Sequence, residues 1–435
     1  MYPNLYYAFK DLIGVEWNWL RIFNSFGFFV ALAFIAAAVV LSIELKRKER
    51  EGLLLSKEET ITVGRAATIG EILLNFILGF LLGYKIIGLF ISNSPLAKDP
   101  QSFIFSKEGS LPMGLLLGFF FAGLKWWERK KQKLAKPEQR KIRIWPHDRV
   151  GDVVIFAAIF GFLGAKIFHN LENWDELMKN PIESLLSFSG LTFYGGLICA
   201  GAAIIYYAKK HGIKVWHLAD AIAPALMLAY ALGRIGCQVS GDGDWGILNS
   251  AYITDTNGKA IRATPETFQQ ELNVHKNFYL HENYDSLSQV EHRSVVAPSF
   301  LPTWMFAYAY PMNVIKEGEL IPGCNEEHCY QLPIPVFPTP FYETVTCLLL
   351  FLLLWVVRKR FKITGQLFGL YLVLNGFERF FIEKIRINTQ YHLFGFHPTQ
   401  AELISAALIV AGAFIIVYLN KFGHKQGLNS TQGMS

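Results

Sequence analysis

Residues 26–43, FGFFVALAFIAAAVVLSI, decide the class of fold. This stretch holds no charged side chain, and Ser42 is its one hydrogen-bonding side chain. A helix of about 20 such residues spans the hydrocarbon core of a bilayer. Lys46-Arg47-Lys48 follow at once, whereas the first 20 residues lack the basic start and apolar run of a cleavable signal peptide. We therefore expect the block around this stretch to be an uncleaved membrane anchor.

Eight further apolar blocks follow the first one. Each is expected to be a helix, because every backbone polar group must find a partner inside the bilayer. Only 17% of all residues are charged, against about 25% in soluble domains. This composition excludes a soluble enzyme, a disordered chain, a small disulfide scaffold and a β-barrel of alternating segments. The sequence predicts an all-α polytopic membrane protein with about nine transmembrane helices, at 24–44, 70–92, 111–126, 152–169, 190–208, 217–236, 341–357, 366–384 and 399–419.

Lys and Arg residues gather in alternate loops, which sets the expected orientation. The rich loops are 45–69, 127–151, 209–216, 358–365 and 420–435, and the poor ones include 170–189 and 237–340. The pattern predicts an external N-terminal segment (1–23), helices over 24–236 and 341–420, a small external head (237–340) and a cytoplasmic tail (421–435). It also explains the net charge of +6 without nucleic acid. The basic runs are interpreted as topology signals, with lipid headgroup binding as the lesser alternative.

Two cysteines lie in the head, in the segment Cys324-Asn325-Glu326-Glu327-His328-Cys329. A disulfide between Cys324 and Cys329 is expected if the outside is an oxidising compartment. A metal site that uses His328 and a fourth ligand is the alternative.

Ionisable residues at membrane depth are costly and therefore mark functional sites. Arg379 and Glu383 are four residues apart on one helix face, and Arg386 continues that stripe. Glu343 lies near the start of another predicted helix. A purely structural ion pair between Arg379 and Glu383 is the alternative.

Arg234 lies in Tyr230-Ala-Leu-Gly-Arg-Ile-Gly-Cys237, where a helix is expected to end near the outer surface. Glycines allow a close approach of a ligand, and an Arg can hold a phosphate bidentately. A Tyr194-Gly195-Gly196 segment opens another helix on that side, although paired glycines also serve helix packing. Together these residues predict a cavity at the outer leaflet for an anionic phospholipid headgroup.

Four motifs in order resemble the prolipoprotein diacylglyceryl transferase family. Phe193–Ile198 resembles the family's His-Gly-Gly-Leu-Ile segment, and Gly233–Cys237 with Trp245-Gly246 resembles its Gly-Arg-hydrophobic-Gly-Asn signature, which ends in Trp-Gly. Phe337–Glu343 is similar to its His-Pro-Ser/Thr-Gln-Leu-Tyr-Glu segment, and Arg379–Arg386 is similar to its Arg-Phe-x-x-Glu-x-x-Arg segment. The family has seven helices, so the helices within 70–126 look like an inserted pair.

The resemblance implies a reaction at a bacterial inner membrane. The diacylglyceryl group of phosphatidylglycerol would pass to the lipobox cysteine of a preprolipoprotein signal peptide, with a thioether as product and glycerol-1-phosphate as leaving group. The partners would be these two substrates and membrane lipids, without nucleic acid. No metal or cofactor is implied, and the active site would face the periplasm.

The family positions assign roles to individual residues. Catalytic roles fall to Arg234, Arg379, Glu383 and Tyr194, and the arginines would stabilise the departing phosphate. Glu383 is either the thiol base or a partner that orients Arg379. Tyr194, which replaces the family's His, is expected to position a substrate. Substrate binding would use Arg234, Arg379, Arg386, Gly195, Gly196, Cys237, Gly246 and Glu343.

Two further questions stay open in the sequence. Cys237 replaces the signature Asn and is not expected to be a nucleophile, since the family transfers the group directly. Either Asp242 or Asp244 replaces the family acid before Trp-Gly. A phospholipid transporter or flippase with the same arginine pair is the chief alternative function, followed by a membrane scaffold and an inactive family member.

Overall fold

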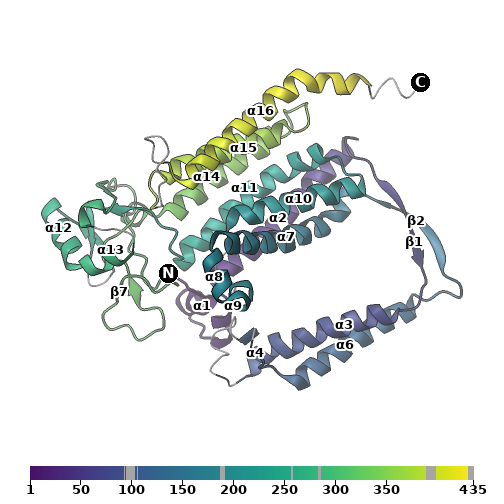
Figure 1. Cartoon of the computed structure of the whole chain (residues 1–435), viewed down its shortest axis with the longest axis horizontal. Helices are drawn as coiled ribbons and strands as arrows, with labels where there is room; N and C mark the ends of the chain where they lie inside the picture. Colours follow the sequence, from purple (N-terminus) through teal and green to yellow (C-terminus); the bar gives the residue numbers. More distant parts are fainter. Residues whose placement is uncertain are drawn as a thin grey trace. The chain divides into compact units, whose positions relative to one another are not determined.

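A computed structural model describes residues 1–92, 94, 103–104, 106–186, 192–255, 258–282, 286–387 and 398–429, and it is mostly helical (Figure 1). The chain divides into two compact units. The first combines Met1–Glu44 with Trp216–Ser435, and the second is Leu45–Val215.

Among the described residues, six helical spans are long and apolar enough to cross a membrane. They are Ser25–Arg50 (α2), Ile69–Ile91 (α3 to α4), Pro146–Glu172 (η4 and α7), Val215–Ser240 (α11), Thr339–Val357 (α14) and Gln400–Lys421 within α16. The prediction of an all-α multi-pass membrane protein is therefore confirmed. The other three predicted blocks are also helical, as α6 (Leu111–Lys131), α10 (Phe193–His211) and α15 (Gln366–Glu383). These three are long enough but less apolar than the six spans, so the number of nine spans is not confirmed.

In the first unit, α14, α15 and α16 (Gln400–Asn429) run side by side (Figure 1). Small residues bring two of them close, because a Cβ at Gly412 in α16 would lie 2.6 Å from the carbonyl oxygen of Gly369 in α15. The charge of Asp220 within α11 has a structural role. Its carboxylate accepts hydrogen bonds from the backbone N–H groups of Gly365 and Phe368, at 2.8 and 3.0 Å, and thereby caps the start of α15.

The helix α11 corrects one expectation. The sequence suggested that the helix ends near Gly236, but α11 continues to Ser240, so Gly233–Cys237 is helical. A Cβ at Gly236 would lie 3.0 Å from Cβ of Phe29 and 3.3 Å from the ring of Phe26, so the missing side chain lets α11 pack against α2. Helix packing, rather than a turn, therefore accounts for this glycine.

The segment after α11 folds around its own apolar core. Three of its two-stranded sheets are β3–β6 (parallel), β4–β5 and β7–β8 (both antiparallel). The core contains Trp245, Phe268, Tyr310 and Ile334. The elements are β3 (Leu248–Asn249), β4 (Tyr252–Thr254), β5 (Ala260–Arg262), α12 (Pro265–Val274), α13 (Lys276–Glu282), η5 (Leu287–Gln289), β6 (His292–Arg293), η6 (Thr303–Met305), β7 (Glu319–Leu320) and β8 (Tyr330–Gln331).

The first residues of the chain attach to this head. They form α1 (Leu5–Ile13) and a 3₁₀ turn, η1 (Asn18–Ile22). Lys10 and Arg21 pair with Glu326 at 3.2 and 3.7 Å. Glu326 lies inside the loop closed by a disulfide between Cys324 and Cys329, which confirms that prediction. The alternative metal site is thereby excluded, because both thiols are consumed.

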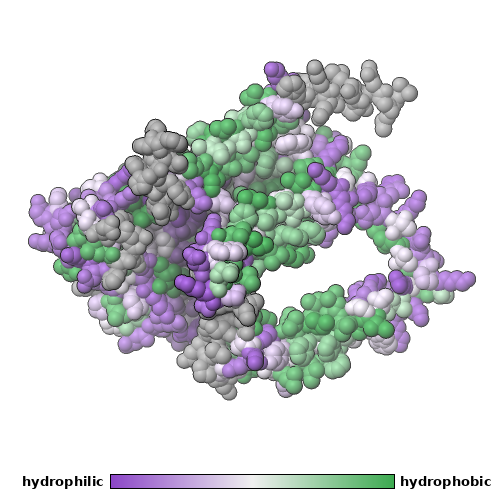
Figure 2. Space-filling view, in the orientation of Figure 1, coloured by the Kyte–Doolittle hydropathy of each residue, from purple (hydrophilic) through white to green (hydrophobic). Residues whose placement is uncertain are grey.

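In the second unit, the helices within 70–126 form a tight antiparallel hairpin. Here α3 (Ile69–Leu81) continues through a π-helical turn, η2 (Leu82–Ile87), into α4 (Gly88–Ile91), and it packs on α6 (Figure 1). A Cβ at Gly79 or Gly83 would lie 2.4 or 2.1 Å from a backbone oxygen of α6. The two glycines are four residues apart, the spacing that lets membrane helices approach closely. Figure 2 shows the apolar outer surface of this hairpin.

A β-ribbon joins the hairpin to the rest of the unit. Strands β1 (Lys57–Val63) and β2 (Glu138–Ile144) pair antiparallel over seven residues each. Both segments were predicted to be basic loops, so the ribbon corrects that expectation. The unit also contains η4 (Pro146–Arg149), α7 (Val150–Glu172), α8 (Trp174–Lys179), α9 (Pro181–Leu186) and α10.

Candidate active site

Glu343 is the centre of a buried group of charges in the first unit. Its side chain lies in the first turns of α14 and is fully buried. Oε2 is 3.1 Å from Nε of Arg234, and Oε1 is 3.2 Å from Nη1 of Arg379. The Tyr230 hydroxyl donates a hydrogen bond of 3.0 Å to Oε1. A buried carboxylate needs such compensation, so Glu343 fixes both arginines and links α11, α14 and α15.

Asp244 forms a second bridge between arginines. One carboxylate oxygen contacts Nη1 of Arg234, and the other is 2.7 Å from Nη2 of Arg386. Burial by itself would raise the pKa of Asp244, but the guanidinium groups of Arg386 and Arg234 outweigh burial and lower it to about 2. Of the two candidate acids, Asp244 is therefore the one that pairs with the arginines.

The third carboxylate is Glu383, predicted as either a base or an orienting partner. Its Oε2 is 2.9 Å from Nη2 of Arg379, one helical turn earlier in α15, and its side chain is only 1% exposed. This geometry fits a group that orients Arg379. The ion pair between Arg379 and Glu383 that their four-residue spacing predicted is therefore present in the structure.

Some hydrogen-bond donors of this cluster stay unused. Three arginines face three carboxylates, those of Glu343, Asp244 and Glu383. Nε and Nη1 of Arg386 are buried and have no hydrogen-bond partner among the described residues. Nη1 of Arg386 reaches Glu343 only at 3.8 Å. Buried donors without a partner are costly, and an anion would satisfy them.

Gly246 is explained by its backbone. Its N–H donates to the carbonyl of Phe337 at 2.9 Å, and the next N–H, that of Ile247, donates to Ile385 at 2.9 Å. A Cβ at Gly246 would lie 2.5 Å from the Ile385 oxygen. This close approach holds Asp244 beside Arg386, so Gly246 helps to position the site.

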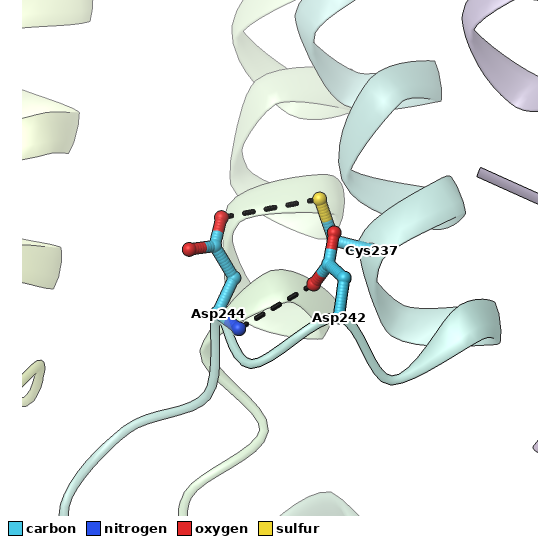
Figure 3. Close-up of side chains that lie close together, drawn as sticks. All are labelled: Cys237, Asp242 and Asp244. Carbon is cyan, nitrogen blue, oxygen red and sulfur yellow. Dashed lines mark hydrogen bonds between the residues drawn. The ribbon is translucent and has the colours of Figure 1, made fainter. Parts of the chain in front are cut away.

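Cys237, Asp242 and Asp244 lie close together at the end of α11 (Figure 3). Their possible ligand atoms all lie within 4.8 Å of one another. A cation does not fit here, because both oxygens of Asp244 already contact arginines and Sγ of Cys237 lies 3.8 Å from Nη1 of Arg234. The geometry therefore gives no support for a metal role of these residues.

Tyr194, Gly195 and Gly196 belong to the second unit and are described within it. They lie in the first turn of α10, and Tyr194 is partly buried. A Cβ at Gly195 would lie 2.4 Å from Cβ of Phe168 in α7, and one at Gly196 would lie 2.9 Å from a backbone oxygen of the same helix. Close helix packing, the alternative considered for these glycines, is thus their local role.

Tyr230 is a site residue that the sequence analysis quoted but did not assign. It precedes Arg234 by one helical turn, so both side chains face Glu343, and the Arg234 guanidinium lies 5.3 Å from the Tyr230 ring centre. The spacing of four residues on one helix was the signal that could have identified it.

Comparisons with known proteins agree with the motifs. Residues 112–418 match the family model described as prolipoprotein diacylglyceryl transferase. Two similar proteins are named phosphatidylglycerol–prolipoprotein diacylglyceryl transferase. One, from Staphylococcus haemolyticus, is 25% identical over 71% of this chain and 81% of its own length. The other, from Leptospira interrogans, is 24% identical over 74% of this chain and 94% of its own length.

Proposed function

The chain belongs to the prolipoprotein diacylglyceryl transferase family, and on this premise we propose that it transfers the diacylglyceryl group of phosphatidylglycerol to the cysteine thiol of a prolipoprotein. It is a multi-pass membrane transferase. The observation that carries the assignment of the site is the buried Arg234–Arg379–Arg386 cluster around Glu343, with unused donors on Arg386.

In this reaction, the arginines stabilise the negative charge of the leaving group. The thiol of a lipobox cysteine loses its proton, and its sulfur forms a bond to the glyceryl carbon. The bond from that carbon to the phosphate oxygen breaks, and the electron pair leaves with glycerol-1-phosphate. The departing phosphate gains negative charge, which Arg234, Arg379 and Arg386 stabilise. Asp244 already orients the donors of Arg234 and Arg386, and Glu343 orients Arg379.

We assign positioning roles to the carboxylates. Glu343 and Glu383 hold Arg379 from two sides, so its guanidinium cannot rotate away when the lipid arrives. The thiol proton passes to the departing phosphate rather than to Glu383, which is buried and ion-paired. Tyr194 and Cys237 orient substrate by hydrogen bonding or packing, and neither acts as a nucleophile.

The basic loops set the proposed location. The protein lies in a bacterial inner membrane, with its N-terminus outside and its C-terminus in the cytoplasm. The end of α11 that carries Arg234 then faces the periplasm, where signal peptides of exported lipoproteins emerge.

The test follows release of glycerol-1-phosphate from phosphatidylglycerol by the purified protein in detergent, with and without a lipobox peptide. We expect release only with the peptide thiol, and a loss of at least 100-fold in Arg234→Ala and Arg379→Ala. Arg358→Ala is the matched control, because Arg358 pairs with the buried Glu44 at 3.0 Å, outside this cluster. Tyr194→Phe reports whether that hydroxyl contributes. If the wild type binds the lipid but releases nothing, the arginines serve a transporter instead.

A further inference from the structure

We propose that the second unit holds a binding pocket for the phosphate group of an anionic phospholipid, formed by residues outside the Glu343 cluster. A cavity of about 140 Å³ lies among the ends of β1, β2, α7 and α10. Its lining combines basic and apolar side chains. The residues are Leu54, Leu55, Lys57, Ile144, Trp145, Pro146, Arg149, His211, Gly212, Ile213 and Lys214.

The positive charge of this pocket is only partly neutralised. Arg149 pairs with Glu59 at 2.5 Å, and His211 lies 3.7 Å from the same carboxylate. Lys57 and Lys214 are exposed and have no ion pair within the described part of the chain. The ammonium groups of Lys57 and Lys214 therefore lack a negative partner beside the cavity, and a phosphate would supply that negative charge.

Two helix starts add to this field. Both α7 and α11 begin at the pocket, after Arg149 and Lys214 respectively, and a helix start attracts anions. The carbonyl end of α10 also lies there, but it is capped, since the N–H groups of Gly212 and Ile213 bond back to Lys209 and Ala208 at 3.2 and 2.8 Å. The local field thus favours an anion.

The other half of the lining fits a lipid rather than a free ion. Leu54 is buried, whereas Leu55 is 74% exposed at the pocket. Cross-strand pairing places Lys57 and Ile144 on one ribbon face together with Ile61 and Ile142. Those two isoleucines are 39% and 36% exposed. That face also carries Glu59, Glu138 and Arg140, so the apolar part of the site is the pocket lining itself. Leu55, Ile144 and Trp145 line the pocket next to the two lysines, an arrangement that matches the boundary between headgroups and acyl chains.

The connections of the ribbon place this face at the membrane surface. The strand β1 joins α2 to α3 through residues 51–56 and 64–68, and both helices are candidate spans. The linkers are short, so the strand stays within about 20 Å of the two helix ends that it joins. The ribbon therefore lies near the membrane surface on that side.

Lys214 of the pocket directly precedes the first residue of α11, whereas Arg234 lies near the last turns of that helix. With the proposed orientation, the pocket faces the cytoplasmic leaflet, whose anionic lipids attract basic residues. The ligand is therefore a structural lipid of that leaflet, not the substrate held beside Arg234.

The experiment measures lipid retention by native mass spectrometry of the purified full-length protein in detergent, titrated with dioleoyl phosphatidylglycerol or dioleoyl phosphatidylcholine. We expect one retained anionic lipid to bind roughly thirty-fold more weakly in Lys57→Gln/Lys214→Gln, with phosphatidylcholine unaffected. The matched control is Lys136→Gln/Lys141→Gln, which removes the same charge from exposed residues outside the pocket lining. All four lysines are exposed, so neither variant should alter folding.

The outcomes separate the possibilities. Weaker anionic lipid binding in the first variant alone supports the pocket. Equal loss in both variants, or none in either, overturns it and leaves the basic residues as topology signals. A titration with soluble glycerol-1-phosphate identifies the source of the phosphate, because binding of that molecule without lipid retention overturns the lipid assignment. Transferase activity is measured in parallel and should persist in both variants, so failure of this proposal is distinct from failure of the proposed function.

Discussion

Replacing Glu343 by Gln should separate the positioning of the arginines from the mere presence of charge. The substitution keeps the side-chain shape but removes the negative charge that Arg234 and Arg379 contact at 3.1 and 3.2 Å. The amide that replaces the carboxylate carries an N–H donor, which faces the guanidinium donors of Arg234 and Arg379. Each guanidinium group therefore loses one of its two carboxylate partners, although neither is itself altered.

The size of the effect follows from burial. The Glu343 side chain is 0% exposed, so solvent cannot compensate for the lost pairs. Breaking a buried ion pair by removing one partner costs about 3–5 kcal/mol. A Coulomb energy of about 4 kcal/mol for charges about 4 Å apart at an effective dielectric constant of about 20 agrees with that range. Loss of the orientation of the arginines should lower kcat by about 10²–10³.

Glu44→Gln is the matched control for stability. Glu44 is also a fully buried glutamate and pairs with one arginine, Arg358, at 3.0 Å. Thermal unfolding followed by intrinsic fluorescence in detergent should show a lower Tm for both variants. Single-turnover transfer below both Tm values should be slow only for Glu343→Gln. Wild-type transfer by Glu343→Gln, or equal slowing in the two variants, would refute the claim that Glu343 orients the catalytic arginines.

Three further predictions test the surroundings of this cluster. The pKa of Asp244 falls from 3.8 to about 2 in the fold, so its stabilisation is complete above about pH 4 and is lost as the pH falls towards 2. The lowered pKa corresponds to about 2.5 kcal/mol at most, which screening of the 37% exposed carboxylate reduces to about 1 kcal/mol; a Tm-against-pH curve that is unchanged in Asp244→Asn would contradict it. Gly246→Ala should cost about 1–3 kcal/mol and most activity, since its Cβ would lie 2.5 Å from the Ile385 oxygen; a wild-type Tm and rate would show that the loop can shift. Cys237→Ala should retain transfer within about tenfold, because its Sγ contacts are 3.8 and 3.9 Å long; complete inactivity with a normal Tm would revive a chemical role for the thiol.

Much of the site could be predicted from local spacing. Arg379 and Glu383 are one helical turn apart, and the structure pairs them at 2.9 Å. The disulfide between Cys324 and Cys329 was expected because both lie in a segment predicted to face an oxidising compartment. The π-helical turn in η2 had no such signal. The β-ribbon was missed because its charged residues dominate the composition, although Ile61 and Val63 alternate with polar neighbours as in a strand.

The sequence alone determined the membrane class, the helical blocks and the set of buried charges, because these depend on local composition and on the high cost of placing charge in a bilayer. Only the tertiary structure decided which charges meet. Asp244 rather than Asp242 bridges Arg234 and Arg386 because the Gly246 backbone is held against residues 337 and 385, about 90 and 140 positions away. Such contacts depend on how segments far apart in the chain pack together, and no local pattern of residues determines that packing.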